Sequence, residues 1–97
     1  MIKIKFGEYM VDVRGHAGDA PAGELICAAI STIIMALRLG LAELGVDTGE
    51  WDIMPGNGHV EANEVPPEGR GMFIMAETAL RHLQETYPDV LKIRSRG

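Results

Sequence analysis

The stretch that decides the fold is residues 24–44, which read ELICAAISTIIMALRLGLAEL. Leucine, isoleucine, alanine and methionine occur on almost every side of a helix drawn through it, and Gly45 follows as a candidate C-cap. A helix that is apolar on most of its faces has to be buried on most of them. A two-layer domain covers only one side of such a helix, so we expect a second copy of the chain to cover part of the rest.

The sequence on either side of this helix predicts short strands and one further helix. Isoleucines alternate with lysines from Ile2 to Phe6, and valines alternate with charged residues up to Arg14, which predicts a β-hairpin with a Gly7-Glu8 loop. Further strands are expected over 51–54, 59–65 and 90–94. The second helix is expected from an apolar stripe that ends before Pro88: Met72, Ala76, Ala79, Leu80, Leu83 and Tyr87.

The predicted element order is ββαββαβ, which indicates an α+β fold. We expect a two-layer sandwich in which two helices cover one face of a largely antiparallel sheet. A chain of 97 residues has room for one domain, spanning 1–97.

Composition excludes several classes of protein. Nine basic against 14 acidic residues give a formal charge of −5, which argues against nucleic acid or an anionic membrane as the main partner. The longest apolar stretch, residues 25–37, falls short of a bilayer span, and the N-terminus lacks the apolar core of an export signal. A single cysteine excludes an internal disulfide framework and a zinc site built on several thiolates. We therefore expect a soluble, cytoplasmic protein.

One pair of residues has the chemistry of a catalytic site. Cys27 is expected in the first turn of the long helix, where unpaired N–H groups and the helix dipole stabilise a thiolate and could stabilise an oxyanion. His16 precedes it by eleven residues, across a small-residue loop that can fold back over the helix start, and an imidazole there could act as the base. The competing interpretation is a small buried cysteine and a solvated turn histidine.

Other candidate residues carry weaker signals. Ser31 lies one turn after Cys27, and we expect its hydroxyl to bond back to the Cys27 carbonyl. His59 and Glu61 alternate on a predicted strand and could share a metal ion, but no third ligand is evident. We therefore predict no metal site and no cofactor.

The segment around this pair resembles a known family. Gly15-His16-Ala17, the loop, Gly23 and then Ile26-Cys27-Ala28-Ala29-Ile30-Ser31 resemble the signature of the ribosomal-processing cysteine proteases (Prp). The resemblance extends over nearly the whole chain. It implies a cysteine endopeptidase, with Cys27 as nucleophile and His16 as general base, that removes a short N-terminal extension from the large-subunit ribosomal protein bL27. It further implies that Gly23 matches a loop glycine with a hinge role and that Gly15 supports the site.

The sequence also departs from this family before the cysteine. The family usually reads Gly-x-Asp and two aliphatic residues before Cys, whereas Gly23-Glu24-Leu25-Ile26-Cys27 is one residue shorter and offers only Glu24 as a nearby acid. We expect two copies of the chain to form a homodimer. The expected binding partner is a peptide or protein substrate. Three alternatives stay open: a phage or prophage relative that processes capsid or scaffold protein, a catalytically degenerate peptide-binding module, and a small redox protein with Cys27 as its sensor thiol.

Overall fold

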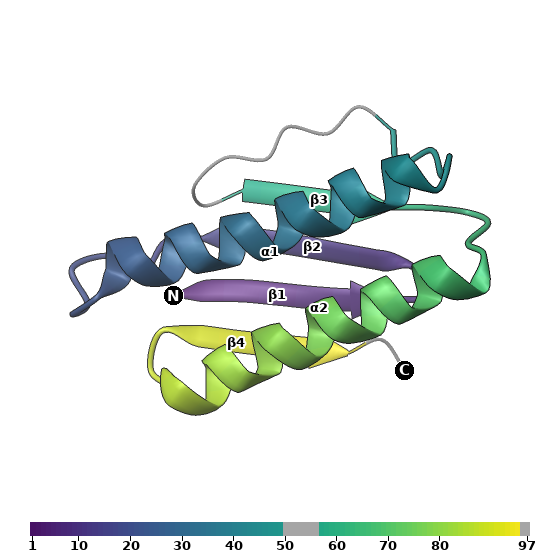
Figure 1. Ribbon diagram of the computed structural model, residues 1–97. Coiled ribbons are helices and arrows are strands. Elements are labelled where there is room, and N and C mark those ends of the chain that lie inside the picture. The colour runs from purple at the N-terminus through teal and green to yellow at the C-terminus, as the bar shows by residue number, and fades with distance from the viewer. Residues whose placement is uncertain (50–56, 96–97) are drawn as a thin grey trace.

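A computed structural model describes residues 1–49 and 57–95 of the chain. Figure 1 shows two long helices lying over a small sheet. The elements in chain order are β1 (Ile2–Gly7), β2 (Met10–Gly15), α1 (Gly23–Glu43), β3 (Asn57–Glu61), α2 (Pro67–Thr86) and β4 (Leu91–Ser95). This is the predicted α+β arrangement with both helices on one face of the sheet. The strand expected over 51–54 lies outside the described residues.

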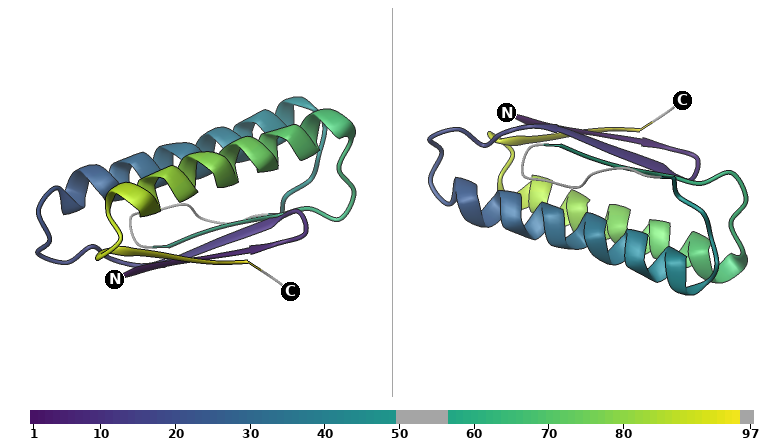
Figure 2. Two further views of the ribbon diagram at one scale, coloured as in Figure 1. Left: turned by 90° about the horizontal axis from the view of Figure 1, so that it is seen from below. Right: turned by 90° about the horizontal axis from the view of Figure 1, so that it is seen from above.

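The sheet is mixed, with the strand order β3-β2-β1-β4. The β1–β2 hairpin and the β2–β3 pair are antiparallel, while β1 and β4 are parallel. A parallel pair needs a crossover connection, and α2 lies in the segment that leads to β4. Figure 2 shows that both helices cover the same face, and no other element among residues 1–49 and 57–95 covers the opposite, open face of the sheet.

The core lies between the helices and the inner face of the sheet. On the strands, alternate residues are buried because side chains point to opposite faces with a period of two. On α1 the buried side chains recur every three or four residues, which is the helical period. The largest fully buried side chains are Ile2, Ile4, Ile26, Ile34, Leu41, Leu80, Leu91, Val11 and Val60.

Several predicted boundaries are corrected by the structure. The hairpin loop consists of Glu8 and Tyr9, because Gly7 still pairs with Met10 and Tyr9 adopts a positive φ of 54°. Strand β3 begins at Asn57 and ends at Glu61, so the predicted strand over 59–65 is too late. Helix α2 starts earlier than its apolar stripe predicts, because Pro67 occupies the first helical position, where a missing N–H costs nothing.

Helix α1 is longer than its most apolar stretch. Among the described residues it is the one helix that could cross a membrane by length and composition, because it continues past Arg38 to Glu43. Residues 25–37 alone are too short to span a bilayer, whereas the whole of helix α1 is long enough. Core helices of soluble proteins pass the same test, and one stripe of α1 is buried in this fold.

Small residues bring the two helices close together. Gly69 of α2 is buried, and a Cβ atom there would lie 2.5 Å from Val65 Cγ1 and 3.1 Å from Leu41 Cδ2. Gly40 of α1 faces Met72, whose sulfur would lie 3.1 Å from an added Cβ. The glycine inside the predicted helix thus allows a close helix–helix approach.

We predict opposite effects for two glycines of the same helix. Gly69→Ala should lower the free energy of unfolding by about 1–3 kcal/mol, because the added methyl group overlaps Val65 and Leu41. Gly71→Ala should raise it by about 0.5–1 kcal/mol, because an added Cβ at Gly71 meets nothing within 4 Å and alanine favours the helix. Urea unfolding of both variants measures the difference, and equal effects would contradict the packing described here.

Candidate active site

His16 and Cys27 line the same hollow at one end of the molecule. The hollow has a volume of about 340 Å³ and lies between the loop after β2 and the first turns of α1. His16 is exposed, and Cys27 is half-buried and carries a free thiol. The remaining lining residues are Ala17, Gly18, Gly23, Glu24 and Ala28. The structure therefore brings the two predicted catalytic residues to one site.

The start of α1 differs from the prediction by one residue, which changes the position of Cys27. The helix begins at Gly23, so Cys27 is its fifth residue and lies just beyond the first turn. The cause is the turn before it: Ala22 adopts a left-handed conformation with φ of 60°, and the Gly23 N–H donates to the Ala20 carbonyl at 3.0 Å. The Ile26 N–H donates to the Ala22 carbonyl, so Glu24 and Leu25 supply the remaining first-turn donors.

Two glycines hold the loop in place. Gly15 has a φ of +101°, and a Cβ atom there would lie 2.3 Å from the Met1 carbonyl oxygen. The Met1 amino group donates to the neighbouring His16 carbonyl at 2.7 Å, so the backbone on both sides of Gly15 touches the chain start. Gly23 is buried, with 3.1 Å between an added Cβ and the Ala17 methyl group. Close packing explains both glycines, and the hinge role of Gly23 stays a prediction.

Glu24 and Ser31 lie differently relative to the hollow. Glu24 is exposed in the first turn of α1, where a carboxylate is favoured by the helix dipole, and it lines the hollow. Ser31 is half-buried one turn beyond Cys27 and is absent from the described lining. The neighbouring Thr32 makes the backward bond expected of Ser31, from its hydroxyl to the Ala28 carbonyl at 2.8 Å.

A second polar cluster lies on the open face of the sheet. His59 Nδ1 is 2.8 Å from Asp12 Oδ1, and His59 Nε2 is 3.1 Å from Glu61 Oε1. Burial raises the pKa of Asp12, but the hydrogen bonds and charges of His59 and Arg14 outweigh it and hold that pKa below its ordinary value. Sequence reasoning missed Asp12, which becomes a neighbour of His59 only through the pairing of β2 with β3.

This cluster does not assemble a metal centre. Among residues 1–49 and 57–95, no group of three or more histidine, cysteine or acidic side chains is arranged to hold a metal ion. Both ring nitrogens of His59 lie beside carboxylate oxygens, so the cluster acts as a hydrogen-bonded link between β2 and β3.

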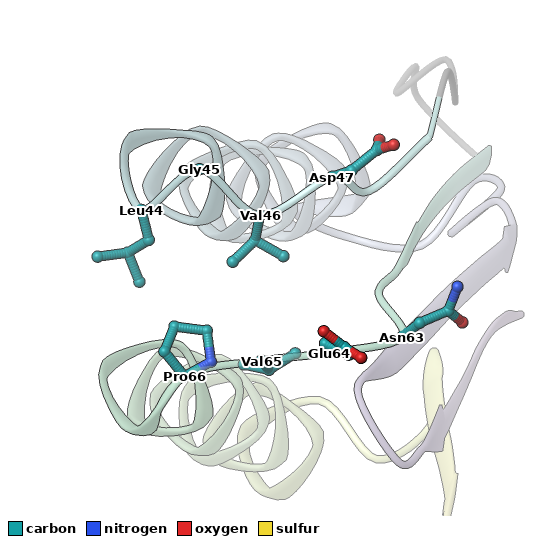
Figure 3. A pocket seen from close by; sticks show the side chains of 8 residues that line it. All are labelled: Leu44, Gly45, Val46, Asp47, Asn63, Glu64, Val65 and Pro66. Carbon is teal, nitrogen blue, oxygen red and sulfur yellow. The ribbon is translucent and has the colours of Figure 1, made fainter.

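Another hollow lies at the other end of α1. It is formed by the end of that helix and the segment before α2, and Asp47, Asn63 and Glu64 are its polar members (Figure 3). Its lining among the described residues is Leu44, Gly45, Val46, Asp47, Asn63, Glu64, Val65 and Pro66. None of these side chains is a nucleophile or a histidine, so the hollow beside Cys27 is the better candidate for peptide chemistry.

A comparison with protein families identifies the chain. The family described as "Cysteine protease Prp" matches residues 1–92, and the chain therefore belongs to that family. It is a cysteine endopeptidase by this membership. No curated protein sequence matches the chain.

Solved structures share the fold at low sequence identity. A ribosomal processing protease Prp from S. aureus, in complex with a substrate peptide, is 16% identical with a TM-score of 0.84, over 99% of this chain and 100% of that one. The same protein with a covalently linked product peptide gives 18% identity and a TM-score of 0.77, with the same coverage. The protein SMU.848 from Streptococcus mutans is 22% identical with a TM-score of 0.81, over 98% of this chain and 93% of that one.

The shared hollow leads to a prediction about thiol reactivity. If His16 activates Cys27, His16→Ala should slow alkylation of the thiol by iodoacetamide about tenfold or more at pH 7, because the thiolate loses its base. The rate is followed against pH for both proteins. His82→Ala is the matched control, since His82 lies exposed on α2 and does not line the hollow. Superimposable pH profiles for wild type and His16→Ala would show that the two residues are not paired.

Proposed function

We propose that this protein removes a short N-terminal extension from a ribosomal protein by cysteine-protease chemistry at Cys27 and His16. The observation that carries the proposal is the shared hollow: in a chain of the Prp family, the single cysteine and a histidine line one cavity. The S. aureus structures that share this fold are of an essential ribosomal processing protease bound to a substrate or product peptide, which supports the substrate class.

The proposed reaction has two halves. His16 takes the proton of the Cys27 thiol, and the sulfur attacks the carbonyl carbon of the scissile peptide bond. The tetrahedral intermediate collapses as the carbon–nitrogen bond breaks, and the His16 imidazolium gives its proton to the leaving amine. A water molecule then loses a proton to His16 and attacks the thioester. The Cys27 sulfur leaves as a thiolate and recovers a proton from His16.

The surrounding backbone and Glu24 support this chemistry. The first-turn donors of α1 belong to Glu24 and Leu25, just before Cys27, and N–H groups at a helix start can stabilise an oxyanion. The Glu24 carboxylate stabilises the helix start through the dipole. A carboxylate near Cys27 opposes the thiolate, whereas one near His16 favours imidazolium, so its electrostatic effects on the pair oppose each other. We therefore assign Glu24 mainly to anchoring the helix start, with Gly15 and Gly23 shaping the loop.

The proposal also includes the compartment. A free, half-buried thiol that has to remain reduced fits the cytoplasm, where thiols are kept reduced. No cofactor or metal enters the proposed mechanism.

The nucleophile is tested by a substitution that preserves its shape. Cys27→Ser should reduce cleavage of a ribosomal precursor peptide by about a thousandfold or more, because the hydroxyl is a far weaker nucleophile than the thiolate. Ser31→Ala is the control one turn along the same helix and should retain most of the activity. Cleavage is measured by mass spectrometry of the products, and circular dichroism confirms folding. Full turnover by the Cys27→Ser variant would contradict the assignment.

We further propose that a second copy of the chain covers the outer surface of the helix pair. An apolar groove of about 440 Å³ runs between the helices, lined by Ile33, Ala36, Leu37, Gly40, Met72, Met75, Ala76 and Ala79. Met75 in this lining is 70% exposed, and Leu39 and Ile74 on the same two helices are 58% and 68% exposed. Contiguous apolar surface of this kind marks interfaces in soluble proteins. Both walls of the groove are apolar, so an identical surface is a complementary partner.

The dimer proposal predicts a change in mass. Light scattering at micromolar concentration should give twice the chain mass of 10.5 kDa for the wild type and the monomer mass for Met75→Glu, which places a charge in the groove. Met10→Glu makes the same replacement on the open face of the sheet and should leave the mass unchanged. A monomeric wild-type protein would contradict the proposal.

A further inference from the structure

The open face of the sheet collects most of the positive charge of the strands. The chain has three lysines, Lys3, Lys5 and Lys92, and the strand register places all of them on this face. Lys3 is paired with Lys92 and also with Arg14, while Lys5 is paired with Arg94 on one side and with the acidic Asp12 on the other. All five basic side chains are exposed. We call Lys3, Lys5, Arg14, Lys92 and Arg94 the basic face.

These five charges lie close together and are largely uncompensated. Side chains two residues apart on a strand are about 6.7 Å apart and neighbouring strands about 4.8 Å, so the basic face occupies a compact area. In the part of the chain that the structure describes, Arg14 has an ion pair with Asp12, and no ion pair is formed by Lys3, Lys5, Lys92 or Arg94. The Arg14 side chain is nevertheless 65% exposed.

The charge of the molecule is therefore divided between its two sides. The strands present five basic residues on the open face, together with the acidic Asp12 and Glu61, for a formal charge of +3. Since the total formal charge is −5, the rest of the chain carries −8. The net charge is a sum over both sides of the molecule. A partner that binds one face responds to the local electrostatic field of that face.

The arrangement of the face argues against a membrane or a basic protein as its partner. Peripheral membrane binding combines basic and apolar residues on one face. Here most of the exposed large apolar side chains, Leu25, Met35, Leu39, Ile74 and Met75, belong to the helices, which lie on the far side of the sheet, while Met1 is exposed beside the start of β1 (Figure 2). A ribosomal protein that is itself basic would be repelled by this face, whereas a chain of phosphates would be attracted to it.

We propose that the basic face binds the phosphate backbone of a structured RNA. The choice of RNA over DNA rests on the proposed function, because a substrate that belongs to the ribosome lies beside RNA. Among the described residues of the open face the one aromatic side chain is His59, which is only 18% exposed and has both ring nitrogens beside Asp12 and Glu61. Without an exposed aromatic platform for an unpaired base, we place the contact on the backbone of a duplex. The face would hold the protease against an RNA-bound substrate while its hollow acts on a peptide extension.

The test compares RNA binding with peptide cleavage. Fluorescence anisotropy of a labelled 20-base-pair RNA duplex measures the affinity between 50 and 200 mM salt. Five phosphate contacts should weaken wild-type binding by about 500-fold across this range, because each contact releases about 0.9 counterion. In the variant Lys3→Gln/Lys5→Gln/Lys92→Gln two contacts remain, so the loss across the range should be only about 12-fold and the affinity at low salt should be lower.

Matched controls make the outcomes decisive. Arg70→Gln removes one positive charge on α2, away from the basic face, and should leave RNA binding within about twofold. Peptide cleavage by the triple variant should equal that of the wild type, since none of the three lysines lines the hollow of Cys27. Unchanged RNA affinity in the triple variant would overturn the proposal, and so would tighter binding to a DNA duplex of the same sequence. Preferential binding to phosphatidylglycerol vesicles or to poly-glutamate would overturn it as well. None of these results depends on whether Cys27 is the nucleophile.

Discussion

The burial of one stripe of α1 against the inner face of the sheet determines where the chemistry can occur. Ile26, Ile30, Ile34, Leu37 and Leu41 follow the helical period and are almost completely buried. Successive helical residues are rotated by about 100°, so Cys27, next to Ile26, lies at the border of this contact rather than inside it. The thiol is therefore half-buried and faces the loop that leaves β2. Hydrophobic packing along the whole helix thus fixes the position of one sulfur atom.

Helices cover one face of the sheet, so its two faces carry different kinds of side chain. Because side chains alternate on a strand, Ile2 and Ile4 belong to the core while Lys3 and Lys5 face solvent. Lysine and arginine on an exposed strand face also discourage edge-to-edge aggregation, so these charges serve the stability of the monomeric sheet as well as any ligand. The link from His59 to Asp12 and Glu61 completes this face at the β3 side with hydrogen bonds instead of a metal.

Much of the fold could be predicted from the sequence because its signals are local. Apolar periodicity placed the long helix within one residue at each end, and strand alternation placed the first hairpin. The parallel pairing of β4 with β1 could not be predicted in this way, since it depends on the path of α2. The sequence predicted a strand as far as residue 65 and a second helix whose apolar stripe begins only at Met72. In the structure Pro67 begins a helix and Gly69 is buried against Leu41, a contact that no local pattern reports.

The same limits apply to the candidate site. Residues with distinctive chemistry can be predicted from the sequence, whereas residues that matter through their position cannot. His16 and Cys27 could be predicted as candidates from the sequence because imidazole and thiol are distinctive groups, and the structure places both in the lining of one hollow. That Ala17, Gly18 and Ala28 line the hollow could not be predicted, because small side chains have no chemical signature and matter here by leaving space.

Two backbone turns set the path of the loop before Cys27. Ala17 is buried, and its carbonyl accepts the Ala20 N–H at 3.3 Å, while the Ala20 carbonyl accepts the Gly23 N–H at 3.0 Å. Two consecutive turns thus carry the chain from β2 to α1, and Ala22 absorbs the change of direction in a left-handed conformation. The Ala20 carbonyl satisfies the Gly23 N–H, which leaves the N–H groups of Glu24 and Leu25 as the first-turn donors that face outward from the helix start. The Ala17 methyl group then meets Gly23 where a larger residue would push the loop outward. Since His16 directly precedes Ala17, this contact limits how far the imidazole can move from the thiol.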